Sequence, residues 1–192
     1  MTPHDVLDFW FGASGSATDG RPRREWFVKD AAFDATIRER FGATIDSAVA
    51  GGLRDWDDSG PQGVLARLLV LDQFTRNAWR GQPASFAGDA LALAAARQLV
   101  DSGADRALTP LQRSFAYMPF EHAEDAAMQE RAVALFAALA AQHADFDETL
   151  DYARRHRDVI ARFGRFPHRN AILGRVSTPA ETAFLQQPGS RF

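Results

Sequence analysis

The chain has 192 residues, a net charge of -3 and 46% hydrophobic residues, so it is long enough for one well-buried core and short for two. The acidic balance argues against a nucleic-acid-binding or anionic-membrane-binding protein, because both usually need a basic surface. No cysteine is present, which excludes disulfides, thiolate metal sites and a cysteine nucleophile. No signal peptide starts the sequence, and no apolar run approaches roughly 18 residues, so we expect a cytoplasmic protein without a membrane span.

Four short motifs predict where helices begin. In each motif a hydroxyl residue stands three positions before an acid or an amide, the spacing of a capping box in which the two side chains accept each other's backbone N–H groups. Three of the four also place proline at the first helical position, where its missing N–H is not needed. The motifs pair Thr2 with Asp5, Ser59 with Gln62, Thr109 with Gln112 and Thr178 with Glu181.

Between these starts the apolar residues recur with the helical period, and no segment alternates over the length of a strand. The predicted helices are 3–11, 24–28 continuing or restarting at 31–50, 61–79, 84–102, 110–117, 123–143, 147–163 and 179–185. No linker divides the chain, so we predict one all-α domain over 1–192. Short loops favour stacked antiparallel helical hairpins or an irregular bundle.

The predicted helix 61–79 carries charged residues on its apolar face. Asp72 lies in the middle of that face and Arg76 follows one turn later, a spacing at which the two can pair. Gln73 and Asn77 are predicted to lie well away from the middle of the face. The pair either fixes helix register as a buried ion pair or lines a cleft and orients a ligand. Asp72, Arg76 and Asn77 are therefore candidate ligand-binding residues.

The predicted helix 147–163 has a similar feature. Arg157 is predicted in the middle of its apolar face, with His156 on the flank. An arginine that faces the core needs a partner. Candidate partners are Asp72, Glu121, Glu124 and Asp125, and both Arg157 and His156 are candidate ligand-binding residues.

The segment 117–125 gathers Glu121, His122, Glu124 and Asp125 beside a proline. Neighbouring carboxylates should raise one another's pKa, and a histidine beside them can act as an acid or a base. Glu121 and His122 are therefore candidate catalytic residues, and Asp125 is a candidate for ligand binding. The alternative is a helix start at which acids favour the helix dipole. No standard metal-ligand spacing is met, so we predict neither a metal nor another cofactor.

The last basic segment, 154–175, holds seven arginines and two histidines against one acid. Gly164 is predicted to end the helix before it. Such a local concentration on an acidic protein indicates either an anion site or an internal clamp to the acidic segment 121–125. Its further candidate ligand-binding residues are Arg165, His168, Arg169 and Asn170.

These motifs, taken together, resemble a bacterial family of domains of unknown function, number 924, along nearly the whole chain. The resemblance implies an all-helical fold of the tetratricopeptide-like superfamily, and it implies no activity. Thr75 and Ala123 stand where the resemblance leads us to expect proline and serine. The matching segments are VLDFWFG at 6–12, DQFTRNAWRG at 72–81, FAGDALAL at 86–93, YMPFEHAED at 117–125 and YARRHRDVIARFGRFPHRNAILGRVSTPAE at 152–181.

Three functional hypotheses follow. The first is binding of a small anionic molecule in a polar cleft lined by the candidate residues. The second is a hydrolase or lyase in which Glu121 and His122 transfer protons and an arginine holds the developing negative charge. The third is a tetratricopeptide-like scaffold for a protein or peptide partner, which rests on fold analogy alone. The oligomeric state stays open.

Overall fold

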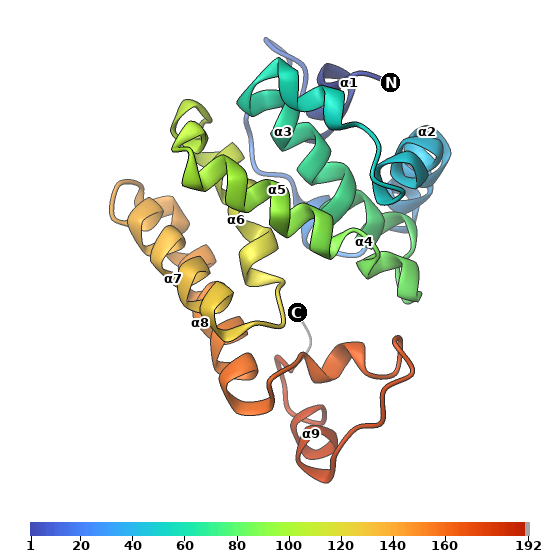
Figure 1. Ribbon diagram of the computed structural model, residues 1–192, viewed down its shortest axis with the longest axis vertical. Coiled ribbons are helices and arrows are strands. Elements are labelled where there is room, and N and C mark those ends of the chain that lie inside the picture. The colour runs from blue at the N-terminus through green and yellow to red at the C-terminus, as the bar shows by residue number, and fades with distance from the viewer. Residues whose placement is uncertain (191–192) are drawn as a thin grey trace. The chain divides into compact units, whose positions relative to one another are not determined.

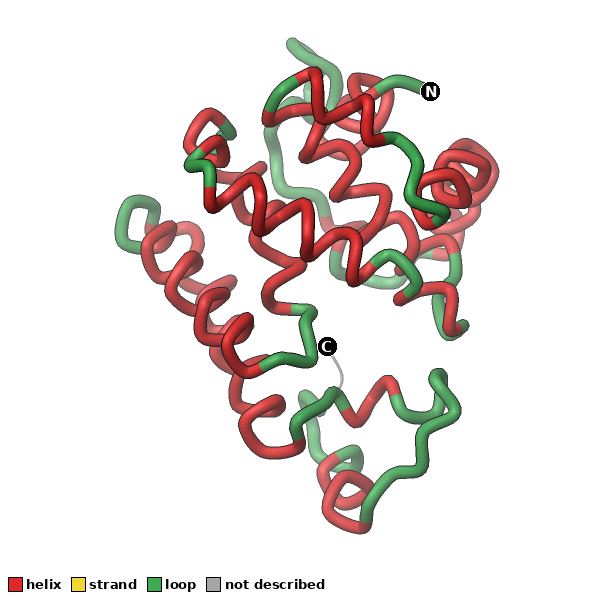
Figure 2. The backbone as a smooth tube through the Cα atoms, in the orientation of Figure 1, coloured by secondary structure: helices red, strands yellow, loops and turns green. Residues whose placement is uncertain are grey.

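The computed structural model describes residues 1–190, and within them it contains helices and turns but no β-strand (Figures 1 and 2). The all-α prediction is thus confirmed. None of the helices in that range combines the length and the hydrophobicity that a membrane span requires. The α-helices are α1 (Pro3–Phe11), α2 (Ala31–Val49), α3 (Pro61–Leu68), α4 (Thr75–Ala78), α5 (Asp89–Asp101), α6 (Pro110–Glu121), α7 (Ala126–Ala140), α8 (Asp147–Phe163) and α9 (Pro179–Phe184).

The chain folds into two compact units. The first unit comprises residues 1–80 and 84–119, and the second comprises residues 81–83 and the chain from Phe120 onward.

Three of the four predicted capping boxes are confirmed, at the starts of α1, α6 and α9. The prediction for Ser59 is wrong, because α3 begins after Gly60 and has no side-chain cap. Gly60 adopts a φ of 74°, which a residue with a side chain rarely does. Gln62 bonds instead to the side chain of Gln112, at 3.0 Å.

The centre of the first unit is one continuous helix made of α3, a π-helical segment (Leu69–Phe74) and α4. The predicted helix 61–79 is therefore confirmed in place and length. The prediction that Gln73 and Asn77 lie away from the core is wrong, since they are only 7% and 4% exposed. Two causes act together: α1, α2 and α5 cover this helix from several directions, and the π turn shifts the register of the residues that follow.

Close backbone approach fixes α5 against this central helix. A Cβ atom on Gly88 would overlap the carbonyl oxygen of Leu71, in the π-helical segment. Glycine is thus required at the start of α5 by space. Its φ of -89° is open to any residue.

Aromatic rings fill the core of the first unit around the centre of α1. The Trp10 indole is fully buried. It stacks on Trp26 with ring centroids 5.7 Å apart and meets the edge of Phe115 at the same distance. Phe9, one residue earlier, contacts Phe41 at 4.9 Å. Such ring pairs add to the free energy gained from burial alone.

The predicted helix 24–28 is a 3-10 turn (Arg24–Trp26), and three predicted helices begin or end at clearly different residues. The predicted helix 84–102 is a short 3-10 turn (Pro83–Phe86) followed by α5, and the predicted helix 123–143 shortens to α7. The predicted helix 110–117 instead continues to Glu121 as α6, through Pro119. Proline usually ends or bends a helix, but here Phe120, in the last turn, is fully buried, and that packing favours the extra turn.

The second unit begins with α7 and α8, which are joined by residues 141–146 and pack along their length as an antiparallel hairpin (Figure 1). This is one hairpin of the predicted kind; the tetratricopeptide-like assignment stays a prediction. Gly164 ends α8 with a φ of 70°, as expected of a left-handed helix cap. Beyond it, Phe166 is fully buried against Val159 and Ile160.

Candidate functional site

The predicted site residues fall into both units. Three of them, Asp72, Arg76 and Asn77, lie on the central helix of the first unit. The other nine lie in the second unit, on the segment from 121 to 125, on α8 and on the loop between α8 and α9.

Asp72 pairs with Arg76, the partner that its spacing predicts. Arg76 Nη1 lies 2.9 Å from Asp72 Oδ1 and 3.0 Å from Asp89 Oδ1. One guanidinium therefore serves two carboxylates, and the Asp72 side chain is only 2% exposed. Gln73 Nε2 donates a further hydrogen bond to Asp72, at 2.6 Å. These contacts favour a structural ion pair over a ligand clamp.

Asn77 also serves the fold. Its Nδ2 donates to Asp34 Oδ1 at 2.8 Å, and Arg80 donates two hydrogen bonds to the same carboxylate, at 2.7 and 2.8 Å. Burial favours the neutral form of Asp34, but the hydrogen bonds from Arg80 and Asn77 outweigh it and hold the pKa below its ordinary value. This network ties α4 to α2.

In the second unit, Glu124 holds the loop that follows α8. Its carboxylate accepts the Phe166 backbone N–H at 2.7 Å and two hydrogen bonds from Arg175, at 2.6 and 2.9 Å. Burial favours the neutral form, but these hydrogen bonds outweigh it and lower the pKa of Glu124. The expected rise of pKa from neighbouring carboxylates is therefore wrong at this residue. The internal-clamp interpretation of the basic segment is supported here.

Two more predicted ligand-binding residues hold backbone or loop structure. Asn170 is 1% exposed; it donates to Ser177 Oγ at 3.0 Å and accepts from Arg175 Nε at 2.9 Å. Asp125 caps α7 by accepting the Met128 N–H at 2.9 Å. That contact agrees with the alternative interpretation of segment 121–125 as a helix start.

Glu121 forms a buried pair with His156. His156 Nδ1 lies 2.8 Å from Glu121 Oε1 and 2.9 Å from the Tyr152 carbonyl oxygen. Both residues of the pair are nearly buried, at 6% and 5% exposure. The Gln129 side chain, which is also buried, donates from Nε2 to the carbonyl oxygens of Glu121 and Ala123, at 2.6 and 2.7 Å. The turn after α6 is thereby fixed, and with it the position of the carboxylate.

The positions predicted for His156 and Arg157 are wrong. His156 faces the core, in line with Ala153 and Ile160, while the Arg157 side chain is 32% exposed. Arg157 bonds to Asp158 at 2.8 Å and lies 3.9 Å from Glu130, so its partners are not the predicted ones. The packing of α7 and Phe166 selects which side of α8 is buried, and helical periodicity alone does not reveal it.

Two histidines and an arginine gather near the Phe166 ring, and a third histidine lies beside one of them. His156 and His168 lie 5.5 and 5.6 Å from it between centroids, and the guanidinium carbon of Arg169 lies 4.6 Å from its centroid. The His122 ring lies 6.2 Å from that of His156, and Arg169 donates to the His122 carbonyl oxygen at 3.0 Å. We call His122, His156 and His168 the histidine cluster. No three potential metal ligands among residues 1–190 are placed to hold an ion together.

His168 is kept neutral within this cluster. Burial lowers its pKa to about 3, and the positive charge of Arg169 acts in the same direction. A neutral imidazole carries one N–H donor and one acceptor nitrogen. His168 therefore adds hydrogen-bonding capacity to the second unit without adding charge at physiological pH.

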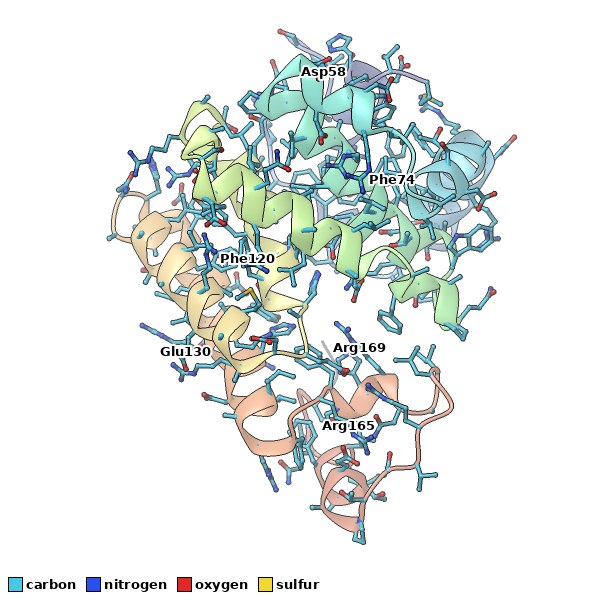
Figure 3. The ribbon with its side chains drawn as sticks, in the orientation of Figure 1. Asp58, Phe74, Phe120, Glu130, Arg165 and Arg169 are labelled. Carbon is cyan, nitrogen blue, oxygen red and sulfur yellow. The ribbon has the colours of Figure 1, made fainter. Side chains whose placement is uncertain are left out.

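Arg165 is held by Glu181. Its guanidinium donates two hydrogen bonds to that carboxylate, at 2.7 and 2.8 Å, and one to the Val176 carbonyl oxygen at 2.9 Å. The hydrogen bonds from Arg165 lower the pKa of Glu181 to about 2. Figure 3 shows Arg165 beside α9, the helix to which Glu181 belongs.

A concavity of about 520 Å³ lies between the end of α8 and the start of α9. Arg162, on its wall, forms no ion pair with any described residue. Its guanidinium carbon lies 4.7 Å from the Phe163 ring and 5.8 Å from the Phe184 ring. Arg162 was not predicted as a site residue, because the helical pattern places it on the exposed side of α8. The predicted helix cap at Gly164 indicated that the chain changes direction just after Arg162. The lining residues are Arg162, Phe163, Arg165, Thr178, Ala180 and Glu181.

Fold and site together define an all-α protein whose second unit carries a buried carboxylate–histidine pair and an arginine-lined concavity. The chain belongs to the family described as bacterial protein of unknown function (DUF924), whose profile matches residues 6–189. The predicted resemblance is thus confirmed. A solved structure of a protein of unknown function from Agrobacterium tumefaciens is similar, with 40% sequence identity, a TM-score of 0.83 and coverage of 96% of both chains. No curated protein matches the chain.

The depressed pKa of His168 has a measurable consequence. In the native protein we expect its ring to stay neutral at pH 5, whereas in the urea-unfolded protein it titrates near 6.5. Because the unfolded state binds the proton first, the contribution of His168 to stability is complete above that pH. It is lost as the pH falls toward 3, by at most about 1.4 kcal/mol per pH unit.

The measurement is an NMR titration of the histidine rings, with the His168→Gln variant assigning the signal. The variant should also show a smaller loss of stability between pH 6.5 and 4 than the native protein in urea unfolding. A native His168 signal that moves near pH 6.5 would show that the ring is hydrated and charged, contrary to this account.

Proposed function

We propose that this protein binds a small anionic ligand, a carboxylate or a phosphate, in the concavity between α8 and α9. The observation that carries the proposal is Arg162, a cation with no ion pair among the described residues, on the wall of a concavity of about 520 Å³. Pockets for small molecules usually measure roughly 300–1,000 Å³. A small organic acid or phosphate ester is of the right size.

The charge of the concavity favours one negative charge. Arg165 and Glu181 form an ion pair and cancel each other. Arg162 then leaves a net positive charge, on a chain whose overall charge is -3. Guanidinium groups bind carboxylates and phosphates in two-point fashion.

Arg165 is already oriented before a ligand arrives. Its bonds to Glu181 and Val176 use Nε and Nη2, so the N–H groups of Nη1 stay available for an anion. Because this side chain is already held in place, binding of a ligand costs less conformational entropy at Arg165. The Thr178 hydroxyl accepts the Glu181 N–H at 3.2 Å and keeps its own hydrogen to donate.

The proposal is tested by isothermal titration of the protein with inorganic phosphate and with succinate. We expect the native protein to bind at least one of these anions. The Arg162→Gln variant should bind that anion about tenfold more weakly than the native protein does, a loss of roughly 1.4 kcal/mol of binding free energy. Arg154→Gln is the matched control, since Arg154 is exposed on the same helix. This substitution removes the same charge at a position outside the concavity. Equal affinity in the native and Arg162→Gln proteins, or no binding of either anion by the native protein, contradicts the proposal.

A second candidate function is acid–base catalysis, and the buried contact between Glu121 and His156 favours it. A carboxylate on one imidazole nitrogen orients the ring and stabilises its protonated form. His156 Nδ1 lies within hydrogen-bond distance of both Glu121 and the Tyr152 carbonyl oxygen. An imidazole oriented in this way can act as a general base toward water or a substrate hydroxyl. His156 thus fits the role that the sequence analysis assigned to His122.

Hydrolysis of p-nitrophenyl acetate tests this second candidate. His156 would take a proton from the attacking water as p-nitrophenolate leaves, so His156→Gln should lower the rate about a hundredfold or more. His143→Gln, which changes an exposed histidine of the same unit, should leave the rate unchanged. A rate that is the same in the His156→Gln and native proteins removes this candidate.

A further inference from the structure

The first unit contains a cavity of its own, of about 510 Å³. It lies where the starts of α1, α3 and α6 meet the loop that follows α1. Three of the four motifs that predicted helix starts therefore contribute to one cavity. The lining residues are Thr2, Pro3, His4, Leu7, Asp8, Phe11, Gly12, Ser14, Asp19, Gly20, Ser59, Gln62, Gly63, Thr109, Leu111 and Gln112.

The apolar part of the lining comes from Pro3, Leu7, Phe11 and Leu111. The Phe11 ring is held rigidly, since it is 5% exposed and meets the edge of Phe115 at 5.5 Å. A preformed apolar surface of this kind can receive the C–H face of a ligand without reorganisation.

The charged acceptors in the lining are the carboxylates of Asp8 and Asp19. Asp8 Oδ2 lies 3.2 Å from His4 Nε2, and Asp19 Oδ2 accepts the Gly15 N–H at 2.8 Å. A carboxylate has about four lone-pair positions, so both keep capacity for further donors. The lining contains no arginine or lysine, although the chain has 22 of them. A phosphate or carboxylate ligand would meet negative charge here without a permanent cation.

Two amides supply donors and acceptors in a fixed arrangement. The side chains of Gln62 and Gln112 bond to each other in both directions, at 3.0 and 3.2 Å. Gln112 Oε1 also accepts the Thr109 N–H, at 3.1 Å, which anchors the pair to the start of α6. Each amide retains one N–H, and Gln62 retains an acceptor position as well.

We propose that this cavity binds an uncharged, hydroxyl-rich small molecule, a sugar or another polyol. Hydroxyl groups can donate to Asp8 and Asp19, and hydrogen bonds to a charged acceptor are the stronger kind. Hydroxyl groups also both donate to and accept from the glutamine amides, and the C–H face of the ligand covers the apolar lining. The proposal concerns a different unit and a different ligand class from the anion site, so each can fail without the other.

The test is an NMR titration of the native, isotope-labelled protein with glucose, xylose and myo-inositol. The comparison ligands are glucose 6-phosphate and putrescine. At least one neutral polyol should shift the backbone signal of Phe11 and the side-chain amide signals of Gln62 and Gln112. The phosphate derivative should bind more weakly than glucose, because it adds negative charge beside Asp8 and Asp19.

Variants connect the binding to the cavity. Asp8→Ala and Gln62→Ala each remove a proposed ligand contact at a residue with exposed surface, and each should raise the Kd about tenfold. Asp46→Ala is the control, since Asp46 is exposed on α2 and does not line the cavity. Absence of shifts with all three neutral polyols, tighter binding of glucose 6-phosphate or putrescine, or unchanged affinity in both variants overturns the proposal.

Discussion

The carboxylate of Glu124 fixes the loop that carries most of the unusual polar residues of the second unit. It accepts hydrogen bonds from the backbone N–H of Phe166 and from both terminal nitrogens of Arg175. Ordering a loop of this length costs conformational entropy at every residue, and charge-assisted hydrogen bonds are among the few interactions strong enough to offset it. Once Phe166 is held, its ring becomes the surface around which His156, His168 and Arg169 gather.

Part of the basic segment 154–175 therefore stabilises the loop. Two of its arginines, Arg165 and Arg175, are bonded to Glu181 and Glu124, so they stabilise the loop before they can serve a ligand. Arg162 is free of such a partner among the described residues, and for that reason it carries the proposed anion site. A similar use of charge occurs on the central helix of the first unit, where Asp72 and Arg76 form a buried pair.

The sequence predicted most of the fold, because helix starts and apolar periodicity are local properties. Thr2 and Thr178 cap their helices as predicted, and Asp72 pairs with the arginine one turn later. The errors arise where tertiary neighbours decide. Gln73 is buried because other helices surround its own and a π turn shifts its register. α6 continues through Pro119 because the following turn packs into the core.

The candidate site was predicted less well than the fold. Periodicity predicts an apolar face, but it does not reveal the side from which α7 and Phe166 cover α8. The buried position was therefore assigned to Arg157, whereas the structure places His156 there. The one local signal near Arg162 is the helix cap at Gly164, and the importance of this arginine depends on which neighbouring residues are already bonded to one another. Residues 121 to 125 were recognised as unusual, yet only the contacts show that Glu121 bonds to a histidine and Glu124 to the loop.

Hydrogen–deuterium exchange of the Glu124→Ala variant tests the central role of that carboxylate most directly. Three hydrogen bonds to a charged group are lost, each worth about 1.5–3 kcal/mol, so amide exchange in residues 164–178 should rise by at least about tenfold. The α7–α8 hairpin should keep its protection, and Glu130→Ala, which changes an exposed glutamate on α7, should alter neither region. Unchanged protection of residues 164–178 in Glu124→Ala would contradict the account, because the loop would then be held by something other than Glu124.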